Sequence, residues 1–424
     1  MKVTLLPGPA AGRVTAIPSK SHLHRLFIYA ALADKKTLLC CEHTQAEDIQ
    51  ATVACLSAIG AEIQPVEEGY LVRPLNRRRL PAGAVLPCGE SGSTLRFMLP
   101  LVCALGISGT FTMSGRLPER PLAPLDEELS RHGIRLWRPD SGTLCCEGKL
   151  AAGNYTLPGN VSSQFISALL LALPLLEGDS SLKVEGPLES ADYITMTLHA
   201  GEAFGFRPSS INNSYNIRGG AEFFSPEKTS VEGDWSNAAF WLCAGAMPGG
   251  DMEIAGLDRQ SVQGDRGICN ILEKMGANLG WAGNALRVFE GERRAVEIYA
   301  AAIPDIVPPL CAVAALGSGQ TIIKNAGRLR LKESDRLHAI AQTLNAMGAE
   351  AAEEPDGLRI QGTESLSGGT VDAWGDHRIA MMAAVASLGC SGPLTITGAG
   401  AVRKSYPAFW EKFRAMGKEV VMDE

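Results

Sequence analysis

The sequence predicts an α/β protein whose chain repeats one structural unit six times, three units in each of two halves. A glycine recurs at intervals of 69 to 73 residues, each time where an apolar, helix-like segment ends. A pattern of two short strands around a polar turn follows five of these glycines. A helix rich in small apolar residues, followed by a short strand, lies upstream of each glycine. The six glycines are Gly60, Gly133, Gly205, Gly276, Gly348 and Gly417.

The recurring glycines are expected to end helices, because glycine adopts the left-handed conformation beyond a helix C-terminus without a steric penalty. Residues 61–74 and 277–289 show the hairpin pattern that follows them. The sixth repeat has no room for a hairpin before residue 424. The helices upstream, such as residues 24–33, 162–176 and 376–388, are apolar nearly all round and should be buried. The predicted unit is therefore helix, strand, helix, strand, strand.

Six such units are too many for one hydrophobic core and divide naturally into three and three. The first strand, expected at residues 2–6, precedes a complete unit and needs a partner elsewhere in the chain. We therefore predict a first, discontinuous domain of residues 1–18 plus 232–424 and a second domain of residues 19–231. The hinge is expected near residues 18–19 and 230–232.

Composition excludes several classes of protein. The 39 basic and 46 acidic residues give a net charge of −7, so no general attraction to nucleic acid or anionic lipid is expected. The longest apolar stretch, residues 165–176, is too short to cross a bilayer. The first residues lack a secretory signal, and the 11 cysteines include no C-x-x-C pair. We expect a mature cytoplasmic protein with no metal site.

Polar and charged residues gather where helices are expected to begin, and helix N-termini attract anions. Cations at eight such positions in an acidic protein predict a cleft for a multiply anionic ligand, which arginine can bind through two parallel hydrogen bonds. The eight cations are Lys20, Arg25, Arg96, Arg120, Lys332, Arg336, Arg378 and Lys404, and the other residues singled out beside them are Ser21, Glu90, Gly92, Ser162, Ser163, Gln164, Asp305, Glu333, Asp376 and His377.

Each motif alone also has a purely structural interpretation. The Ser-Lys-Ser run is compatible with a capped helix and a solvated lysine, and Arg120 with a surface ion pair. The glycine-rich run before Thr94 is neither a Walker A loop nor a dinucleotide fingerprint. By contrast, Lys332 and Arg336 would repel each other on one helix face unless an anion lay between them.

Ten motifs, taken in order, resemble those of the 5-enolpyruvylshikimate-3-phosphate (EPSP) synthase family from end to end. They are PSKSHLHR, GESGSTLRF, LPERPL, VSSQFISALL, ESADYIT, VEGDWSNAAF, IPDIVPPL, LRLKESDRL, WGDHRIAMM and KSYP. The resemblance implies a two-domain, inside-out α/β barrel. Each domain would hold three βαβαββ units about an approximate threefold axis, with helices inside, and would close over ligands at a hinge.

The resemblance also implies a transferase of aromatic amino-acid biosynthesis. The enolpyruvyl group of phosphoenolpyruvate would pass to the 5-hydroxyl of shikimate 3-phosphate, releasing phosphate through a tetrahedral intermediate. No cofactor, nucleic acid or membrane is implied, and a monomer is expected.

The resemblance assigns residues by motif position. Shikimate 3-phosphate would be held by Lys20, Ser21, Arg25, Ser162, Ser163, Gln164, Ser190, Tyr193, Asp305 and Lys332. Phosphoenolpyruvate would be held by Lys20, Gly92, Arg120, Gln164, Arg336, Arg378 and Lys404. Asp305, Glu333 and Lys20 would be catalytic, because the vinyl carbon must gain a proton as the hydroxyl loses one. Which group carries which proton stays open.

Two positions depart from the family pattern, and two other functions remain alternatives. Glu90 and Arg328 stand where relatives often carry asparagine, which leaves their contacts open. The sister transferase acting on UDP-N-acetylglucosamine usually has a cysteine that residues 112–120 lack. A non-catalytic, anion-binding repeat protein would not need Asp305 or Glu333.

Overall fold

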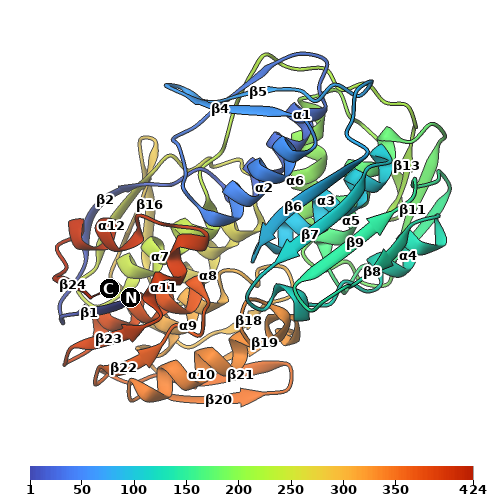
Figure 1. The fold of residues 1–424 in the computed structure, drawn as a ribbon. Helices are drawn as coiled ribbons and strands as arrows, with labels where there is room; N and C mark the ends of the chain where they lie inside the picture. The colour runs from blue at the N-terminus through green and yellow to red at the C-terminus, as the bar shows by residue number, and fades with distance from the viewer. Residues whose placement is uncertain (424) are drawn as a thin grey trace. The chain divides into compact units, whose positions relative to one another are not determined.

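The computed structural model describes residues 1–423, and its chain divides into two compact units (Figure 1). Unit 1 comprises Met1–Ile17 and Glu232–Glu424, and unit 2 comprises Pro18–Val231. Each unit contains three four-stranded sheets.

Unit 2 is built from helices that alternate with short strands. Its helices are α1 (Lys20–Leu32), α2 (Glu47–Ala58), α3 (Gly92–Leu105), α4 (Leu125–Arg131), α5 (Ser163–Ala172) and α6 (Ala191–Glu202), with 3₁₀ turns η1 (Leu117–Glu119) and η2 (Leu173–Leu175). Its strands are β3 (Thr37–Cys40), β4 (Glu62–Val66), β5 (Gly69–Arg73), β6 (Gly83–Gly89), β7 (Ser108–Met113), β8 (Arg135–Trp137), β9 (Thr143–Glu147), β10 (Asn154–Pro158), β11 (Ser180–Glu185), β12 (Ser209–Ile211), β13 (Ser214–Ile217) and β14 (Lys228–Ser230). The sheet orders are β14-β3-β5-β4, β6-β7-β9-β8 and β10-β11-β13-β12.

Unit 1 repeats the same plan. Its helices are α7 (Trp235–Ala246), α8 (Ile268–Lys274), α9 (Val307–Ala314), α10 (Arg336–Ala346), α11 (His377–Ala386) and α12 (Phe409–Ala415), with 3₁₀ turns η3 (Gly264–Gly267), η4 (Gly327–Leu331), η5 (Ser387–Gly389) and η6 (Ala399–Lys404). Its strands are β1 (Lys2–Leu5), β2 (Ala11–Thr15), β15 (Asp251–Ala255), β16 (Asn278–Ala282), β17 (Ala285–Phe289), β18 (Glu297–Tyr299), β19 (Gln320–Lys324), β20 (Glu350–Glu354), β21 (Gly357–Gln361), β22 (Gly369–Asp372), β23 (Leu394–Thr397) and β24 (Val420–Asp423). The sheet orders are β16-β17-β15-β2, β18-β19-β21-β20 and β22-β23-β1-β24.

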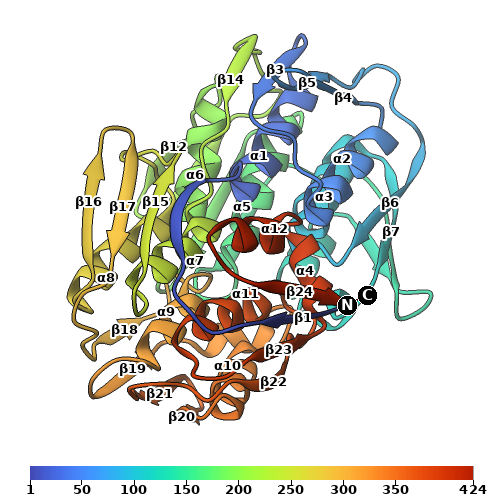
Figure 2. The same cartoon turned by 90° about the vertical axis from the view of Figure 1, so that its left-hand side faces the viewer.

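The repeating glycines follow helices in both units, and all six have the predicted positive φ, between 82° and 108°. Antiparallel hairpins follow five of them, as expected. In the sixth repeat β24 pairs with β1, which also pairs with β23, so the first strand has the distant partner that the sequence required. Figure 2 shows β1 running beside these C-terminal strands within unit 1.

The strand that precedes each of the two crossovers forms the edge of a sheet and pairs with a strand that is distant in sequence. β2 pairs in parallel with β15 in unit 1, and β14 pairs in parallel with β3 in unit 2. The chain just before each crossover is therefore held in a hydrogen-bonded ladder of its own unit. The crossover at residues 231–232 is therefore short and begins directly after a strand.

The first helix of each repeat is buried almost all round, as its composition predicts. All residues of α11 are buried, and Gln164 is the exception in α5. In unit 2, α3 packs on α5 and α5 packs on α6, so their N-terminal turns are set by a rigid core. Unit 1 uses α7, α9 and α11 in the same way.

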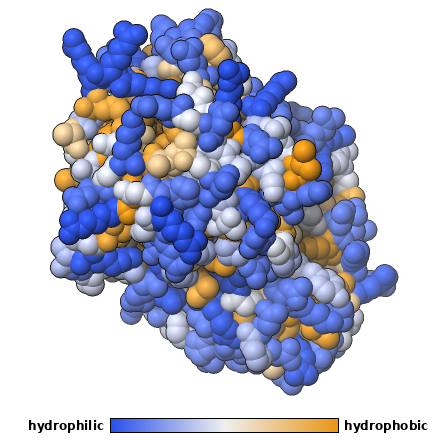
Figure 3. Space-filling view, turned by 90° about the vertical axis from the view of Figure 1, so that its right-hand side faces the viewer, coloured by the Kyte–Doolittle hydropathy of each residue, from blue (hydrophilic) through white to orange (hydrophobic). Residues whose placement is uncertain are grey.

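The mixed α/β class is confirmed, and none of the sheets formed by residues 1–423 closes into a barrel. Within that range, no helix combines the length and apolar character that spanning a membrane demands. Polar and charged side chains dominate the face drawn in Figure 3, where hydrophobic residues form small, separate groups.

Candidate active site

Serine residues cap three buried helices of unit 2. The Ser19 side chain accepts from His22 N at α1, Ser91 from Thr94 N at α3, and Ser162 from Gln164 N at α5. Each cap satisfies one of the four N–H groups that a helix start leaves unpaired, so the others are available to anions. These three positions match the predicted helix starts.

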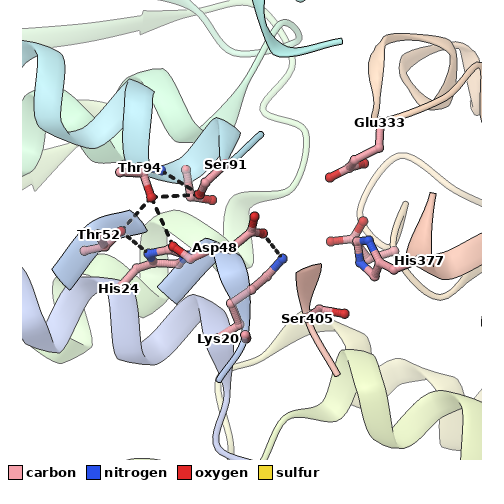
Figure 4. A network of polar contacts seen from close by, with 12 residues as sticks. Lys20, His24, Asp48, Thr52, Ser91, Thr94, Glu333, His377 and Ser405 are labelled. Atoms are coloured by element: carbon pink, nitrogen blue, oxygen red, sulfur yellow. Dashed lines mark hydrogen bonds and ion pairs between the residues drawn. The ribbon is translucent and has the colours of Figure 1, made fainter. Parts of the chain in front are cut away.

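Lys20, predicted to be both binding and catalytic, forms an ion pair that the sequence did not reveal. Its Nζ lies 2.6 Å from Asp48 Oδ2, and the two side chains are 15% and 12% exposed (Figure 4). Asp48 lies in the first turn of α2. The sequence signal that could have revealed this ion pair is the acidic pair at residues 47–48, which lies at a helix start.

Arg25 is 2% exposed and joins three helices through neutral oxygens. Its Nε donates to Thr197 Oγ1 at 2.7 Å, and its Nη1 donates to the Ser21 carbonyl at 2.6 Å. Its Nη2 donates to the Tyr193 carbonyl at 3.0 Å and to Ser167 Oγ at 3.4 Å. Burial lowers the pKa of Arg25 to about 10, because no carboxylate is among its acceptors in the described chain.

Two guanidinium groups converge on the first residue of α3. A Cβ added at Gly92 would lie 2.7 Å from Arg120 Nη1 and 2.8 Å from Arg96 Nη1. Arg96 Nη1 also donates to Gln164 Oε1 at 2.6 Å, and Gln164 Nε2 donates to Ser93 Oγ at 2.9 Å. The predicted residues Gly92, Arg120 and Gln164 therefore lie together, and Arg96 joins them although the family pattern did not assign it a role.

Glu90 and Ser190 occupy unusual surroundings near these helix starts. The Glu90 carboxyl lies directly against the Cα of Gly115, whose φ of 54° favours glycine, and a Cβ there would collide with it. Ser190 precedes α6 with a left-handed φ of 54° and is 2% exposed. Tyr193 enters the network around Arg25 through its backbone carbonyl.

Asp305 is the centre of the predicted group in unit 1. Its Oδ1 lies 2.9 Å from Arg336 Nη1, 3.4 Å from Arg378 Nε and 3.7 Å from Lys332 Nζ. Arg378 Nη1 also donates to the Asp305 backbone carbonyl at 2.9 Å. Burial by itself would raise the pKa of Asp305, but the charges of Arg378, Lys332 and Arg336 outweigh it and hold this pKa well below the usual range.

Arg336 is 1% exposed and contacts three carboxylates. Besides Asp305, it donates through Nη2 to Glu333 Oε2 at 2.7 Å and through Nε to Asp376 Oδ2 at 2.8 Å. Figure 4 draws Glu333 and His377, which both belong to unit 1. Lys332, Arg336 and Arg378 thus balance three carboxylates, and burial lowers the pKa of Lys332 to about 8.

The structure corrects the predicted placement of several cations. Lys332 precedes α10 and directly follows η4, so it does not share a helix face with Arg336. The anion expected between these two cations is Asp305 of the chain itself. Arg120 follows η1, and Lys404 ends η6, where its Nζ donates to the Gly375 carbonyl at 2.7 Å.

The predicted site residues are divided between the two units. Unit 2 contains Lys20, Ser21, Arg25, Gly92, Arg120, Ser162, Ser163, Gln164, Ser190 and Tyr193. Unit 1 contains Asp305, Lys332, Glu333, Arg336, Arg378 and Lys404. Arg328 lies in η4. Burial is the main cause of the lowered pKa of Lys332, and the charges of Arg336 and then Arg328 lower it further. No group of three or more His, Cys, Asp or Glu side chains within residues 1–423 is placed to hold a metal ion.

Clustered cations and carboxylates of this kind are typical of enzymes that act on small, multiply anionic molecules. A family model described as "EPSP synthase (3-phosphoshikimate 1-carboxyvinyltransferase)" matches residues 6–413. The chain therefore belongs to the EPSP synthase family and is a transferase of the shikimate pathway, as the motif resemblance predicted.

Relatives and solved structures support the same family. A 3-phosphoshikimate 1-carboxyvinyltransferase of Clostridium kluyveri is 40% identical, covering 99% of this chain and 98% of that protein. One of Clostridium acetobutylicum is 39% identical, with the same coverage. The structure of EPSP synthase from Acinetobacter baumannii matches with a TM-score of 0.80 and 27% identity, covering 99% of this chain and 100% of that one. The comparisons do not favour the UDP-N-acetylglucosamine or non-catalytic alternatives.

Proposed function

We propose that this chain transfers the enolpyruvyl group of phosphoenolpyruvate to the 5-hydroxyl of shikimate 3-phosphate and releases inorganic phosphate. The observation that carries the proposal is that the Asp305 carboxylate contacts three cations, Lys332, Arg336 and Arg378. Such a group can take a proton from a hydroxyl while the cations hold anionic substrate. Membership of the family supplies the identity of the two substrates.

The charges on the substrates would raise the pKa of Asp305 from its depressed value. In the structure Asp305 and Glu333 both accept hydrogen bonds from Arg336, and Asp305, whose pKa is well below its usual range, is a weak base. Phosphate and carboxylate groups of phosphoenolpyruvate would draw Arg336, Arg378 and Lys404 toward themselves. The pKa of Asp305 would then rise toward the operating pH, because its stabilising charges are shared with a ligand.

We assign the subsites from the residues that lie together in each unit. In unit 2, Gly92, Arg120 and Gln164 would hold phosphoenolpyruvate with Lys20, whose charge Asp48 partly balances. The capped start of α5 would bind the phosphate of shikimate 3-phosphate through free N–H groups. The residues assigned to shikimate 3-phosphate are Lys20, Ser21, Arg25, Ser162, Ser163, Gln164, Ser190, Tyr193, Asp305 and Lys332.

The reaction balances without an external oxidant or reductant. The hydroxyl oxygen adds to C2 of phosphoenolpyruvate while its methylene carbon gains a proton, and the hydroxyl proton goes to a base. The resulting tetrahedral adduct loses the methyl proton and expels phosphate. Asp305, Glu333 and Lys20 are the proposed acid and base groups, since both proton transfers reverse between the two stages.

The arrangement of the repeats belongs to the same proposal. We propose an inside-out α/β barrel in each domain, with three βαβαββ units around an approximate threefold axis. The domains are residues 1–18 plus 232–424 and residues 19–231, hinged near 18–19 and 230–232. The enzyme is proposed to be a cytoplasmic monomer that needs no metal or organic cofactor. Small-angle scattering with saturating shikimate 3-phosphate tests the hinge, and an unchanged radius of gyration with calorimetrically confirmed binding contradicts it.

Phosphate release is the direct test of the function. Phosphoenolpyruvate is supplied with shikimate 3-phosphate, unphosphorylated shikimate or UDP-N-acetylglucosamine in parallel reactions. We expect release with shikimate 3-phosphate, much less with shikimate, and none with the nucleotide sugar. Equal release without any acceptor, or a preference for the nucleotide sugar, contradicts the proposal.

A further inference from the structure

Four buried side chains form a continuous chain of hydrogen bonds between three helices of unit 2. His24 Nδ1 on α1 lies 2.7 Å from Thr52 Oγ1 on α2, which lies 2.7 Å from Thr94 Oγ1 on α3. Thr94 Oγ1 lies 2.7 Å from Ser91 Oγ, the cap of α3 (Figure 4). Each of the four residues is at most 1% exposed. Water therefore does not compete for these bonds, and each lost partner is costly.

The donors and acceptors in this series of hydrogen bonds can be assigned one direction. Thr94 has a single hydroxyl proton, which it donates to Ser91 Oγ or to the Asp48 carbonyl at 3.3 Å. With the Thr94 proton used in this way, Thr52 donates to Thr94, and His24 donates to Thr52 through Nδ1. His24 Nε2 consequently carries a lone pair, and within the described residues it has no hydrogen-bond partner.

The surroundings keep His24 in this neutral form. Burial, followed by the charges of Lys20 and Arg25, lowers its pKa well below the usual value. Phe97 packs edge to face against the imidazole with the ring centres 6.4 Å apart. An imidazolium would place an N–H at Nε2 where no acceptor is available.

The series of hydrogen bonds leads to two parts of the proposed phosphoenolpyruvate subsite, the Lys20–Asp48 ion pair and the start of α3. Thr94 contacts the Asp48 carbonyl, and the Asp48 carboxylate pairs with Lys20. Thr94 also contacts Ser91, which directly precedes Gly92 at the start of α3. Both the partner of Lys20 and the loop before Gly92 therefore depend on the Thr94 hydroxyl.

We propose that Thr52 and Thr94 are positioning residues that orient Lys20 and the Gly92 segment toward phosphoenolpyruvate. This inference rests on the proposed function, because that function assigns Lys20 and Gly92 to phosphoenolpyruvate. Both hydroxyls are buried, so they would act through Asp48 and Ser91 rather than by touching substrate. Lys20 is also assigned to shikimate 3-phosphate, but neither threonine contacts Arg25, so binding of that substrate should depend on them less.

The test compares hydroxyl removal with hydroxyl retention. Thr94→Val and Thr52→Val keep the shape of the side chain, whereas Thr94→Ser keeps the hydroxyl. We expect the valine variants to raise KM for phosphoenolpyruvate roughly tenfold, the value of one buried hydrogen bond. The calorimetric Kd for shikimate 3-phosphate should rise less than KM for phosphoenolpyruvate, because of Lys20 and Gly92 only Lys20 is assigned to both substrates, and Thr94→Ser should stay near wild type.

Thr343→Val is the matched control, because Thr343 is buried on α10 and its hydroxyl has no hydrogen-bond partner in the described chain. A merely structural role predicts lower stability with an unchanged KM for phosphoenolpyruvate, or equal loss of both substrates. Either result in an active enzyme overturns the inference while the proposed function stands. A wild-type chain without activity contradicts the proposed function instead.

The direction of the chain can be tested without turnover. NMR of the full chain carrying ¹⁵N-labelled histidine should show His24 protonated at Nδ1 and bare at Nε2 at neutral pH. The same signal should change in Thr52→Val, whereas Thr343→Val should leave it unchanged. A proton on Nε2 in the wild type would falsify the directional chain and, with it, the positioning role.

Discussion

Asp305 and Glu333 accept hydrogen bonds from two nitrogens of one guanidinium, that of Arg336, at 2.9 and 2.7 Å. A third carboxylate, Asp376, accepts a hydrogen bond from Arg336 Nε at 2.8 Å. The two proposed acid and base groups are therefore coupled through one cation. Any ligand that draws Arg336 away removes a hydrogen bond from both carboxylates and raises the pKa of Asp305.

The first prediction concerns these two carboxylates. Asp305→Asn and Glu333→Gln remove the charge and keep the shape, so they should lower kcat by roughly 10²–10⁴-fold, the usual contribution of an acid or base group. Binding of shikimate 3-phosphate, measured by calorimetry, should weaken much less. Near wild-type turnover in both variants would remove them from the proton transfers.

The second prediction separates a binding arginine from one that also supports the fold. Arg120→Lys keeps the charge and loses the planar, two-pronged contact, so KM for phosphoenolpyruvate should rise while shikimate 3-phosphate still binds. Arg336→Lys should in addition destabilise unit 1, because it disrupts a buried pair with Asp376 whose side chains are 1% and 0% exposed. Thermal unfolding should show a lower Tm for Arg336→Lys than for Arg120→Lys. Equal loss of both substrates in Arg120→Lys would mean that the subsites are wrongly assigned.

The sequence predicts the repeats well because their signals are local. The positive φ at Gly60 and at the five equivalent glycines follows from helix termination, a property of a few neighbouring residues. Pairings such as Lys20 with Asp48 and Arg336 with Asp305 join helices and loops distant in sequence, so only the packed structure shows them. Spacing alone also placed Lys332 inside a helix that begins at Arg336.

The third prediction uses the crowding at Gly92. A Cβ there would approach the Arg120 and Arg96 guanidiniums to less than 3 Å, so Gly92→Ala should displace at least one of them. We expect KM for phosphoenolpyruvate to rise by about tenfold or more, with a smaller effect on shikimate 3-phosphate. Gly280→Ala on β16 is the control, because a Cβ there meets no atom within 4 Å. Unchanged kinetics in Gly92→Ala would show that neither guanidinium contacts phosphoenolpyruvate.

The last prediction concerns Asp265, a buried carboxylate in unit 1 that accepts a hydrogen bond from Ser236 Oγ. Burial, and then the negative charge of Asp305, raises the pKa of Asp265 to about 7. In the unfolded chain this carboxyl has an ordinary pKa near 3.8, so between about pH 4 and 7 the folded protein binds the extra proton. The contribution of Asp265 to the free energy of unfolding therefore falls as the pH rises through this window, by at most about 1.4 kcal/mol per pH unit.

Asp265→Asn removes that dependence, because its amide does not ionise. The variant should gain stability relative to the wild type as the pH rises from 4 to 8, and the gain should level off above pH 7, where both states of the wild type are ionised. Urea unfolding at pH 4.5, 6 and 8 measures this difference, and comparing one variant across pH cancels the constant cost of changing the bond to Ser236. A difference between variant and wild type that is the same at all three pH values would show that Asp265 ionises as easily in the folded protein as in the unfolded chain.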